Sequence, residues 1–430
     1  MRGTLYIKKR SLTEWMIIFM VLIPFGFAAL IEFLGFPSIV RYTTDAVWLC
    51  MLVTLVINKF KMPTRELHNI NLLFVLFVLG TLIGFALNLY SPFYYLWGAR
   101  NNFRFFVYFF YCAIFLKADT VENVLKWLDW LFYINFLIVL VQFFLLDKQM
   151  DYLGGIFGTE KGCNGKLILF LCIINSKSVL YYFSAKEKVS VFAIKCIISI
   201  LIAVMAELKI YFVLLAFIVA LGSSITRFSV KKVVIFSLVA LCIFYGTVAM
   251  VALFPSWAGV FSLGRMLEVA TSEGGYTGSG DLNRLTAIPT LWNGLLTSPI
   301  QKLFGYGLGN CDTSLFSFLR TPFFEKYEYL HYNWFSSAFM FIETGLTGFA
   351  MYLLFFIFVF VGAHKFEKSQ KGNKEWCQLA KMMAIISVIL IFYNASMRIE
   401  EAYMVYFILA FPFVRLKENK VVSSETQEAA

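Results

Sequence analysis

Long apolar runs alternate with short polar loops along almost the whole chain. A run of 18 or more apolar residues predicts a transmembrane helix, because about 20 residues are needed to cross a hydrocarbon core ~30 Å thick. A helix satisfies its own backbone polar groups inside the bilayer, so we expect an all-helical membrane protein with many spans. The pattern predicts twelve transmembrane helices, near residues 15–34, 43–58, 70–89, 101–116, 125–146, 165–184, 189–206, 208–222, 232–254, 345–362, 378–394 and 400–415.

One polar stretch, residues 255–332, interrupts this pattern between the ninth and tenth predicted helices. We expect a large extracytoplasmic loop there, where a membrane protein can act on a water-exposed substrate. The apolar run that follows is too long for one span, which predicts a short interfacial helix over 333–343, broken around Thr344 and Gly345. The predicted units are nine helices in 1–254, the loop in 255–332, the interfacial helix and three more helices in 333–416, and a cytoplasmic tail in 417–430.

The basic residues predict the orientation of these units. The chain is 60% hydrophobic and carries a formal net charge of +11, with its lysines and arginines gathered in alternate loops such as 8–10, 59–65 and 365–374. The positive-inside rule places such loops in the cytoplasm. Both termini are then cytoplasmic and the 255–332 loop faces outward. Because this distribution explains the positive charge, nucleic acid is not expected as a partner.

Within the polar stretch, residues 281–295 carry apolar side chains at helical spacing. We expect an amphipathic helix that begins at Asp281 as its N-cap, bends at Pro289 and carries Arg284 near the edge of its apolar stripe. The glycine-rich residues 271–280 before it predict a mobile link. The stripe consists of Leu282, Leu285, Ile288, Trp292 and Leu295.

Few residues on the predicted outer side can carry chemistry. His331 is the one histidine expected there, and histidine suits proton transfer near neutral pH, although a lone histidine can also be structural. Arg100 and Arg104 lie four residues apart near the start of the fourth predicted helix, on one face. An arginine inside a membrane is costly, which favours a functional role over snorkelling of the side chain to the interface.

Two other charged groups occupy predicted outer turns. Glu207 and Lys209 form one, and Arg398, Glu400 and Glu401 form the other. Composition favours simple polar turns for both. The cations on the outer side would nevertheless suit a phosphate or pyrophosphate, since arginine and lysine bind such anions through charge-assisted hydrogen bonds. A lipid-linked pyrophosphate is an outward-facing anion whose tail stays in the bilayer.

The sequence GYGLGN, residues 305–310, predicts a glycine-rich turn that allows close approach of the backbone. It lacks the third glycine and the preceding strand of a dinucleotide-binding motif. This turn belongs to a longer pattern that resembles the signature of the O-antigen polymerase and O-antigen ligase superfamily: an arginine, a tryptophan, a "P…lfGyGlG" turn, and an "HN…E.G..G" run that enters a span. The matching residues are Arg284, Trp292, Pro299, Gly305, Gly307, Gly309, His331, Glu343, Gly345 and Gly348, with Tyr332 as an insertion between His331 and Asn333.

The resemblance implies a GT-C-like helical fold in the bacterial inner membrane. It implies glycosyl transfer from an undecaprenyl-pyrophosphate-linked donor, with no nucleotide sugar, metal or other cofactor. Lys209 stands where ligase members carry an arginine, and it lacks the bidentate guanidinium. The residues implied as catalytic are Arg284, His331 and Glu343, and those implied as substrate-binding are Arg100, Arg104, Lys209, Gly305, Gly307 and Asn333.

The preferred function is a polymerase of O-antigen, capsule or exopolysaccharide repeat units. Its partners would be the undecaprenyl-pyrophosphate-linked oligosaccharide, the lipid bilayer, a chain-length regulator and a flippase. The nearest alternative is an O-antigen ligase that moves glycan to lipid A core, and the lysine at 209 favours the polymerase. An alternative of another class is a flippase or transporter of lipid-linked oligosaccharide, for which inverted repeats or helices broken at mid-membrane would be expected.

Overall fold

A computed structural model describes residues 10–225, 230–253, 271, 280–312, 314 and 316–414 of the 430-residue chain. All secondary structure in these ranges is helical, which confirms the predicted all-helical class. The predicted tail, 417–430, and residues 272–279 of the predicted mobile link lie outside the described residues.

The helices differ widely in length. The first are α1 (Leu12–Leu22), α2 (Pro24–Ala28), α3 (Thr43–Ile57), α4 (Arg65–Asn88), α5 (Pro92–Phe115), α6 (Ala118–Phe144), α7 (Asn164–Phe183), α8 (Val189–Met205), α9 (Lys209–Ile225) and α10 (Val230–Leu253). The polar stretch contributes the short helices α12 (Ala287–Thr290), α13 (Pro299–Phe304) and α14 (Pro322–Tyr327). After it come α15 (Ser336–Lys368), α16 (Lys374–Tyr393) and α17 (Ala402–Leu409). Single turns of 3-10 or π helix cover Ala29–Phe33, Ser38–Tyr42, Met150–Tyr152, Gly155–Phe157, Leu291–Leu295, Ser317–Leu319, Glu328–Leu330, Tyr332–Trp334, Ser396–Arg398 and Phe411–Phe413.

Side-chain caps fix where several apolar helices begin. Ser11 and Glu14 form a capping box at the start of α1, in which each side chain accepts a hydrogen bond from the other residue's backbone. Thr64 caps α4 and Asn373 caps α16 in the same way, through one side-chain bond each. Such caps satisfy backbone N–H groups that have no partner in the first turn. The polar loops therefore pass into apolar helices without unsatisfied donors at these points.

Seven helices of the described part are long and apolar enough to cross a membrane. The chain thus has the features of a helical membrane protein, but the predicted number of twelve spans is not confirmed. The first predicted span forms two helices that meet at an angle of 53° before Pro24 and would make an eighth crossing together. The α5 helix is not among the seven, and three other predicted spans are shorter apolar helices, Val189–Met205, Lys209–Ile225 and Ala402–Phe413. The seven candidates are Ser38–Ile57, Arg65–Asn88, Ala118–Phe144, Asn164–Phe183, Ile235–Leu253, Ser336–Lys368 and Lys374–Tyr393.

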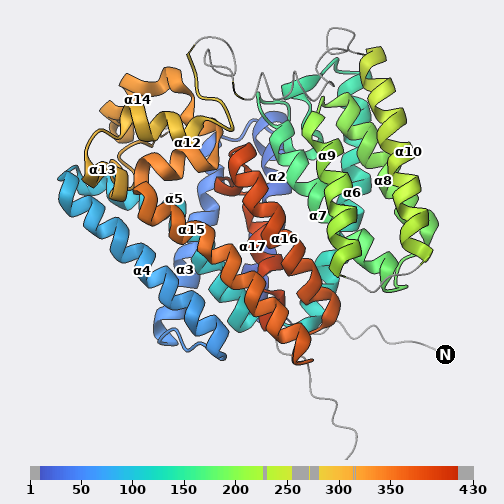
Figure 1. The fold of residues 1–430 in the computed structure, drawn as a ribbon, viewed down its shortest axis with the longest axis horizontal. Helices are drawn as coiled ribbons and strands as arrows, with labels where there is room; N and C mark the ends of the chain where they lie inside the picture. Colours follow the sequence, from blue (N-terminus) through green and yellow to red (C-terminus); the bar gives the residue numbers. More distant parts are fainter. Residues whose placement is uncertain are drawn as a thin grey trace, which may run out of the picture.

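The α17 helix is an interior helix, because every one of its residues is buried. In Figure 1 it lies beside α16 at the centre, with α3, α4 and α5 to the left and α6 to α10 to the right. The Tyr406 ring of α17 packs between Phe105 of α5 and Phe355 of α15, with ring centroids 5.3 and 5.6 Å away. A helix that is apolar all round can be either a membrane span or a buried core helix. The sequence alone therefore did not distinguish the two for 400–415.

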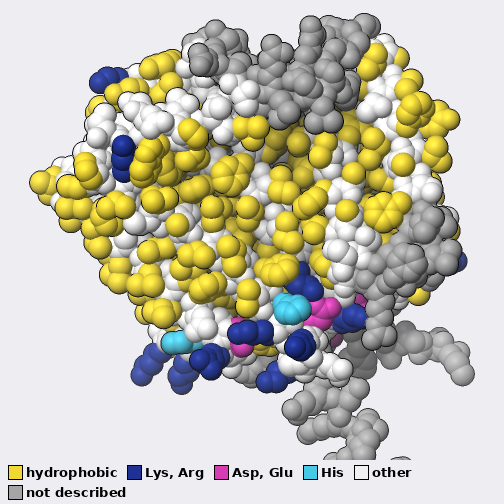
Figure 2. Space-filling view, viewed as in Figure 1, with side chains coloured by type: hydrophobic (Ala, Val, Ile, Leu, Met, Phe, Trp, Pro, Cys, Tyr) yellow, Lys and Arg dark blue, Asp and Glu magenta, His cyan; other side chains and the backbone are white. Residues whose placement is uncertain are grey.

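Loops predicted to share a side of the membrane do meet in the structure. Lys186 forms an ion pair with Glu375 at 3.1 Å. One cavity of about 420 Å³ is lined by residues of both the 63–66 and the 365–371 loops, namely Pro63, Thr64, Arg65, Glu66, Lys365, Phe366, Ser369 and Lys371. Figure 2 shows Lys and Arg side chains along the lower edge of the molecule, below a broad hydrophobic face. The helices α12, α13 and α14 of the polar stretch lie at the opposite, upper end (Figure 1). Which end is cytoplasmic stays a prediction.

Cysteine labelling tests this orientation. We expect Thr290→Cys to react with a membrane-impermeant maleimide in intact cells, once any outer membrane is permeabilised, and Ser369→Cys to react only after lysis. Both positions are exposed, on α12 and just after α15 respectively. The background carries Cys50→Ser, since Cys50 is the exposed cysteine of the chain. Labelling of Ser369→Cys alone in unlysed cells would reverse the orientation.

The polar stretch departs from its predicted helix, whereas the apolar run after it contains the predicted break. The amphipathic helix over 281–295 was wrong in its start and regularity: Asp281 does not cap a helix, α12 begins at Ala287, and a π-helical turn, Leu291–Leu295, follows it. Pro289 has no backbone N–H and cannot support a regular helix through this region. The predicted break in the run after 332 is confirmed, because Gly345 has φ 62° and ψ −165° inside α15. The helix before the break begins at Ser336.

Candidate active site

The GYGLGN turn is held against the break in α15. The backbone N–H of Tyr306 donates to the Ile342 carbonyl at 2.8 Å, and that of Gly307 donates to the Glu343 carbonyl at 3.0 Å. These carbonyls can accept because the helix is interrupted after them and offers no regular i+4 donor. The turn and the beginning of α15 therefore form one backbone-paired unit at the upper end of the molecule.

The glycines of this unit are explained by close packing against protein. A Cβ atom on Gly305 would lie 2.5 Å from the Ile342 carbonyl oxygen, and one on Gly345 would lie 2.5 Å from the Gly305 nitrogen. Both glycines also have positive φ, 71° and 62°, which other residues adopt at a cost. A Cβ on Gly307 would overlap the Tyr90 ring. Other residues of the protein therefore occupy the space where a side chain at Gly305 or Gly307 would lie. Contact of these glycines with substrate stays a prediction.

The Glu343 side chain holds the GYGLGN turn through hydrogen bonds to the backbone. One of its carboxylate oxygens accepts hydrogen bonds from the backbone N–H groups of Gly309, at 2.9 Å, and Cys311, at 3.3 Å. The side chain is 0% exposed, and its other oxygen has no hydrogen-bond partner within the described ranges. Glu343 therefore positions the turn. A catalytic acid or base has to reach the reacting atoms, and burial keeps the Glu343 oxygens away from any open space.

Two substitutions distinguish a positioning role of Glu343 from a catalytic one. Glu343→Gln should keep near-normal thermal stability and activity, because the amide oxygen can accept the same two backbone hydrogen bonds. Glu343→Ala should lower the free energy of unfolding by roughly 2–4 kcal/mol, since two buried N–H groups lose their acceptor. Thermal unfolding of the detergent-purified protein measures the stability of each variant, and the assay of the function proposed below measures its activity. A stable but inactive Glu343→Gln would instead make the carboxylate catalytic.

Arg398 is the functional candidate that composition did not single out. It ends the Ser396–Arg398 turn between α16 and α17, and its guanidinium carbon lies 3.1 Å from the centre of the Phe339 ring. Burial lowers the pKa of Arg398, and the nearby Asp312 and Glu343 carboxylates act in the opposite direction. Within the described ranges no hydrogen bond or ion pair engages its side chain. Arginine stays protonated in proteins, so the site contains a cation without a contacting counter-ion.

Arg284 contacts the same region from the polar stretch. Its Nε donates to the Tyr393 carbonyl at 3.1 Å, and its guanidinium lies over the rings of Tyr393, at 4.6 Å, and Phe335, at 5.8 Å. Phe335 is the N-cap residue of α15, and Phe339 follows it four residues later in the first turns of that helix. Arg284 and Arg398 therefore lie over two aromatic rings at the N-terminal end of α15. We call them the arginine pair.

His331 and Asn333 precede Phe335 and α15 directly in the sequence. His331 has φ 49°, and its ring stacks on Trp334 with centroids 4.0 Å apart. Both His331 and Asn333 are half-buried, and in the described part of the chain neither side chain makes a hydrogen bond. The Leu282 N–H donates to the Leu330 carbonyl at 3.0 Å, which joins the segment of Arg284 to that of His331. Arg284 and His331 therefore lie on two segments that are hydrogen-bonded to each other.

Arg104 positions the turn that carries Arg398. Its side chain, 4% exposed, donates to the Glu400 carboxylate at 3.0 Å and to the Arg398 carbonyl at 3.2 Å. Burial alone would raise the pKa of Glu400, but the Arg104 guanidinium and further hydrogen bonds lower it to about 2. The carboxylate therefore stays charged and the pair stays intact at neutral pH. Arg104 therefore acts through Arg398, and its own buried side chain is not accessible to a ligand.

The other predicted substrate-binding cations also have protein partners. Arg100 binds both oxygens of Asp45, at 2.9 and 2.5 Å, so its guanidinium fork is occupied. Lys209 pairs with Glu207 at 3.1 Å. The predicted contact of Arg100 and Lys209 with a pyrophosphate would require these ion pairs to be shared or exchanged.

Neither a metal cluster nor a match to another protein identifies the site. In the ranges that the structure describes, no group of three or more His, Cys, Asp or Glu is placed to hold a metal ion. No family model, no curated protein and no solved structure matches the chain.

Proposed function

We propose that the protein is a membrane glycosyltransferase that polymerises polysaccharide repeat units, with a glycan on undecaprenyl pyrophosphate as donor. The observation that carries this proposal is the arginine pair on the first turns of α15. Guanidinium groups bind phosphate oxygens through strong, often bidentate, charge-assisted hydrogen bonds. Arg398 has no contacting counter-ion in the described part, which suits a site that receives its anion from a substrate.

The chemistry follows from where charge develops. The acceptor sugar hydroxyl attacks the anomeric carbon of the donor glycan, and the bond from that carbon to the pyrophosphate oxygen breaks. The bonding electrons leave with the pyrophosphate, where Arg284 and Arg398 stabilise the added charge. His331 takes the proton of the attacking hydroxyl as a general base. Asn333, half-buried beside it, orients the acceptor, while Arg104 and Glu343 hold the Arg398 turn and the GYGLGN turn in place.

The setting of this reaction belongs to the same proposal. The protein lies in the bacterial inner membrane with both termini in the cytoplasm, and the arginine pair faces outward. The helices have a GT-C-like arrangement with up to twelve crossings, and no cofactor takes part. A flippase delivers the lipid-linked repeat unit, and a chain-length regulator acts with the polymerase.

Deletion of the gene tests the proposal in cells. We expect surface glycan to shorten to single repeat units and the wild-type gene to restore long chains. Long chains that persist on the lipid carrier without transfer to lipid A core would indicate a ligase instead. Repeat units trapped on the cytoplasmic face would indicate a flippase. Normal surface chains would contradict all three functions.

A further inference from the structure

The cavity of about 420 Å³ between the start of α4 and the end of α15 is lined by more cations than carboxylates. The two helices pack against each other, and we call this cavity the α4–α15 pocket. Glu66 is the one carboxylate of its lining, which also contains three cations, Arg65, Lys365 and Lys371. Three positive charges minus one negative charge leave the lining with a net charge of +2.

The carboxylates that follow the pocket residues in sequence are already paired with other lysines. Glu367 accepts a hydrogen bond from Lys381, and Glu375 forms its ion pair with Lys186. In the described ranges no hydrogen bond or ion pair engages the side chain of any of the three lining cations. Glu66 lies in the first turn of α4, where a carboxylate balances the positive end of the helix dipole. The surplus of the pocket is therefore not neutralised by contacting protein groups there.

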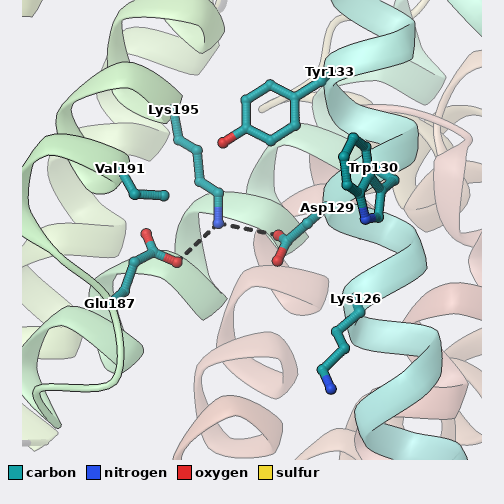
Figure 3. A pocket seen from close by; sticks show the side chains of 7 residues that line it. All are labelled: Lys126, Asp129, Trp130, Tyr133, Glu187, Val191 and Lys195. Atoms are coloured by element: carbon teal, nitrogen blue, oxygen red, sulfur yellow. Dashed lines mark hydrogen bonds and ion pairs between the residues drawn. The ribbon is translucent and has the colours of Figure 1, made fainter. Parts of the chain in front are cut away.

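The polar pocket between α6 and α8 shows the opposite arrangement (Figure 3). Its Lys195 ammonium lies between two carboxylates, 3.1 Å from that of Asp129 and 2.8 Å from that of Glu187. Lys126 is the other cation of the lining, so two positive charges meet two negative ones. That pocket is balanced by its own side chains, whereas the α4–α15 pocket has a surplus that an anion could balance.

Exposed apolar side chains begin close to the pocket on both helices. Val361 of α15 is 43% exposed and precedes Lys365 by four residues, and Leu72 of α4 is 52% exposed and follows Arg65 by seven. These separations are about 6 and 10 Å along a helix axis. Both helices are candidate membrane spans, and Figure 2 shows the broad hydrophobic face above the basic lower edge. The pocket cations therefore lie where the headgroups of surrounding lipids are expected. The apolar surface continues with Val75, Leu76, Leu79 and Ile83 on α4 and with Leu354, Ile357 and Phe358 on α15.

We infer that the α4–α15 pocket binds the headgroup of an anionic phospholipid. The phosphate oxygens accept charge-assisted hydrogen bonds from Arg65, Lys365 and Lys371, and the acyl chains lie along the apolar surface of α4 and α15. Basic pockets between membrane helices suit headgroups with more than one negative charge, and a lipid with two phosphodiester groups matches the surplus of two. The site lies at the opposite end of α15 from the arginine pair, and the inference does not depend on the proposed glycosyl transfer.

Native mass spectrometry of the delipidated full-length protein tests the inference, with separate titrations of cardiolipin, phosphatidylethanolamine and inorganic phosphate. We expect the wild type to bind one cardiolipin, which has two phosphodiesters, at about tenfold lower concentration than phosphatidylethanolamine. One cation near an anionic headgroup typically contributes about fivefold in affinity, so the double variant Lys365→Ala, Lys371→Ala should weaken cardiolipin binding on the order of 20-fold. Glu66→Gln should strengthen it by up to about fivefold, because a repelling charge is removed. A misfolded variant would not show such a gain.

The matched control is the double variant Lys188→Ala, Lys374→Ala, which removes two exposed lysines that do not line the pocket and should leave cardiolipin binding unchanged. Lys365 and Lys371 are also exposed, so their removal is expected to keep the wild-type fold. Equal uptake of the two lipids by the wild type would overturn the preference for an anionic lipid. Equal effects of the two double variants would overturn the location of the site. Displacement of bound cardiolipin by millimolar inorganic phosphate would assign the pocket to a soluble phosphate instead.

Discussion

Arg398→Ala is expected to abolish detectable polymer while the protein remains in the membrane at its normal level. A positioned cation that stabilises leaving-group charge typically contributes on the order of 10²–10³ in rate. Arg398 lies over Phe339 without a contacting counter-ion in the described ranges, so its loss breaks no ion pair there. Arg398→Lys keeps the charge but loses the planar fork, so its activity should fall between that of alanine and wild type. Glycan chain length in complemented cells measures the polymerising activity of each variant.

Arg284→Ala should give the same loss, because both guanidinium groups are proposed to hold one pyrophosphate. The matched control is Arg320→Ala in the same polar stretch. Arg320 is exposed and pairs with Glu328 at 2.8 Å on the surface, an interaction typically worth about 0–1 kcal/mol. It should leave chain length unchanged. Chains of normal length from Arg284→Ala or Arg398→Ala would contradict the role given to the pair.

Gly345→Ala should destabilise the whole upper end of the molecule. Position 345 has φ 62°, and an added Cβ would lie 2.5 Å from the Leu303 carbonyl oxygen and the Gly305 nitrogen. Those atoms are backbone and cannot rotate away, so the GYGLGN turn or α15 must shift. Positive φ and overpacking each cost about 1–3 kcal/mol, so the free energy of unfolding should fall by roughly 2–5 kcal/mol. Thermal unfolding of the purified protein measures the loss.

Gly80→Ala in α4 is the control for this substitution. Nothing lies within 4 Å of a Cβ added there, and the residue is inside a regular helix. Alanine in a helix interior is favoured over glycine by about 0.5–1 kcal/mol, so Gly80→Ala should be neutral or stabilising. Equal unfolding temperatures for the two variants would show that the break at Gly345 tolerates a side chain.

The helical class and the break at Gly345 were predictable because they depend on local sequence. Apolar runs of sufficient length specify helices, and a Thr-Gly step in an over-long run marks an interruption. The number of spans was not predictable in the same way. Buried and lipid-facing helices have the same composition, as α17 shows, and Pro24 bends the first run into two helices. Those outcomes depend on packing between distant segments.

The candidate site also combines features that the local sequence predicts with features that depend on tertiary contacts. Arg100 and Arg104 were singled out because a charge in an apolar run needs a reason, and the reason proves to be a carboxylate 55 or 296 residues away. Composition alone assigns Arg398 to a simple polar turn together with Glu400 and Glu401. In the structure Glu400 pairs with Arg104, which leaves Arg398 without that neighbour. Only the tertiary contacts reveal which cation remains available.

The most direct test of the proposed function is the product length formed by the purified protein from a purified undecaprenyl-pyrophosphate-linked repeat unit, with no nucleotide sugar present. We predict a ladder of polymer from the wild type and single repeat units from Arg284→Ala and Arg398→Ala. A strict need for nucleotide sugar, or a wild-type ladder from both variants, would contradict the lipid pyrophosphate donor and its binding by the arginine pair.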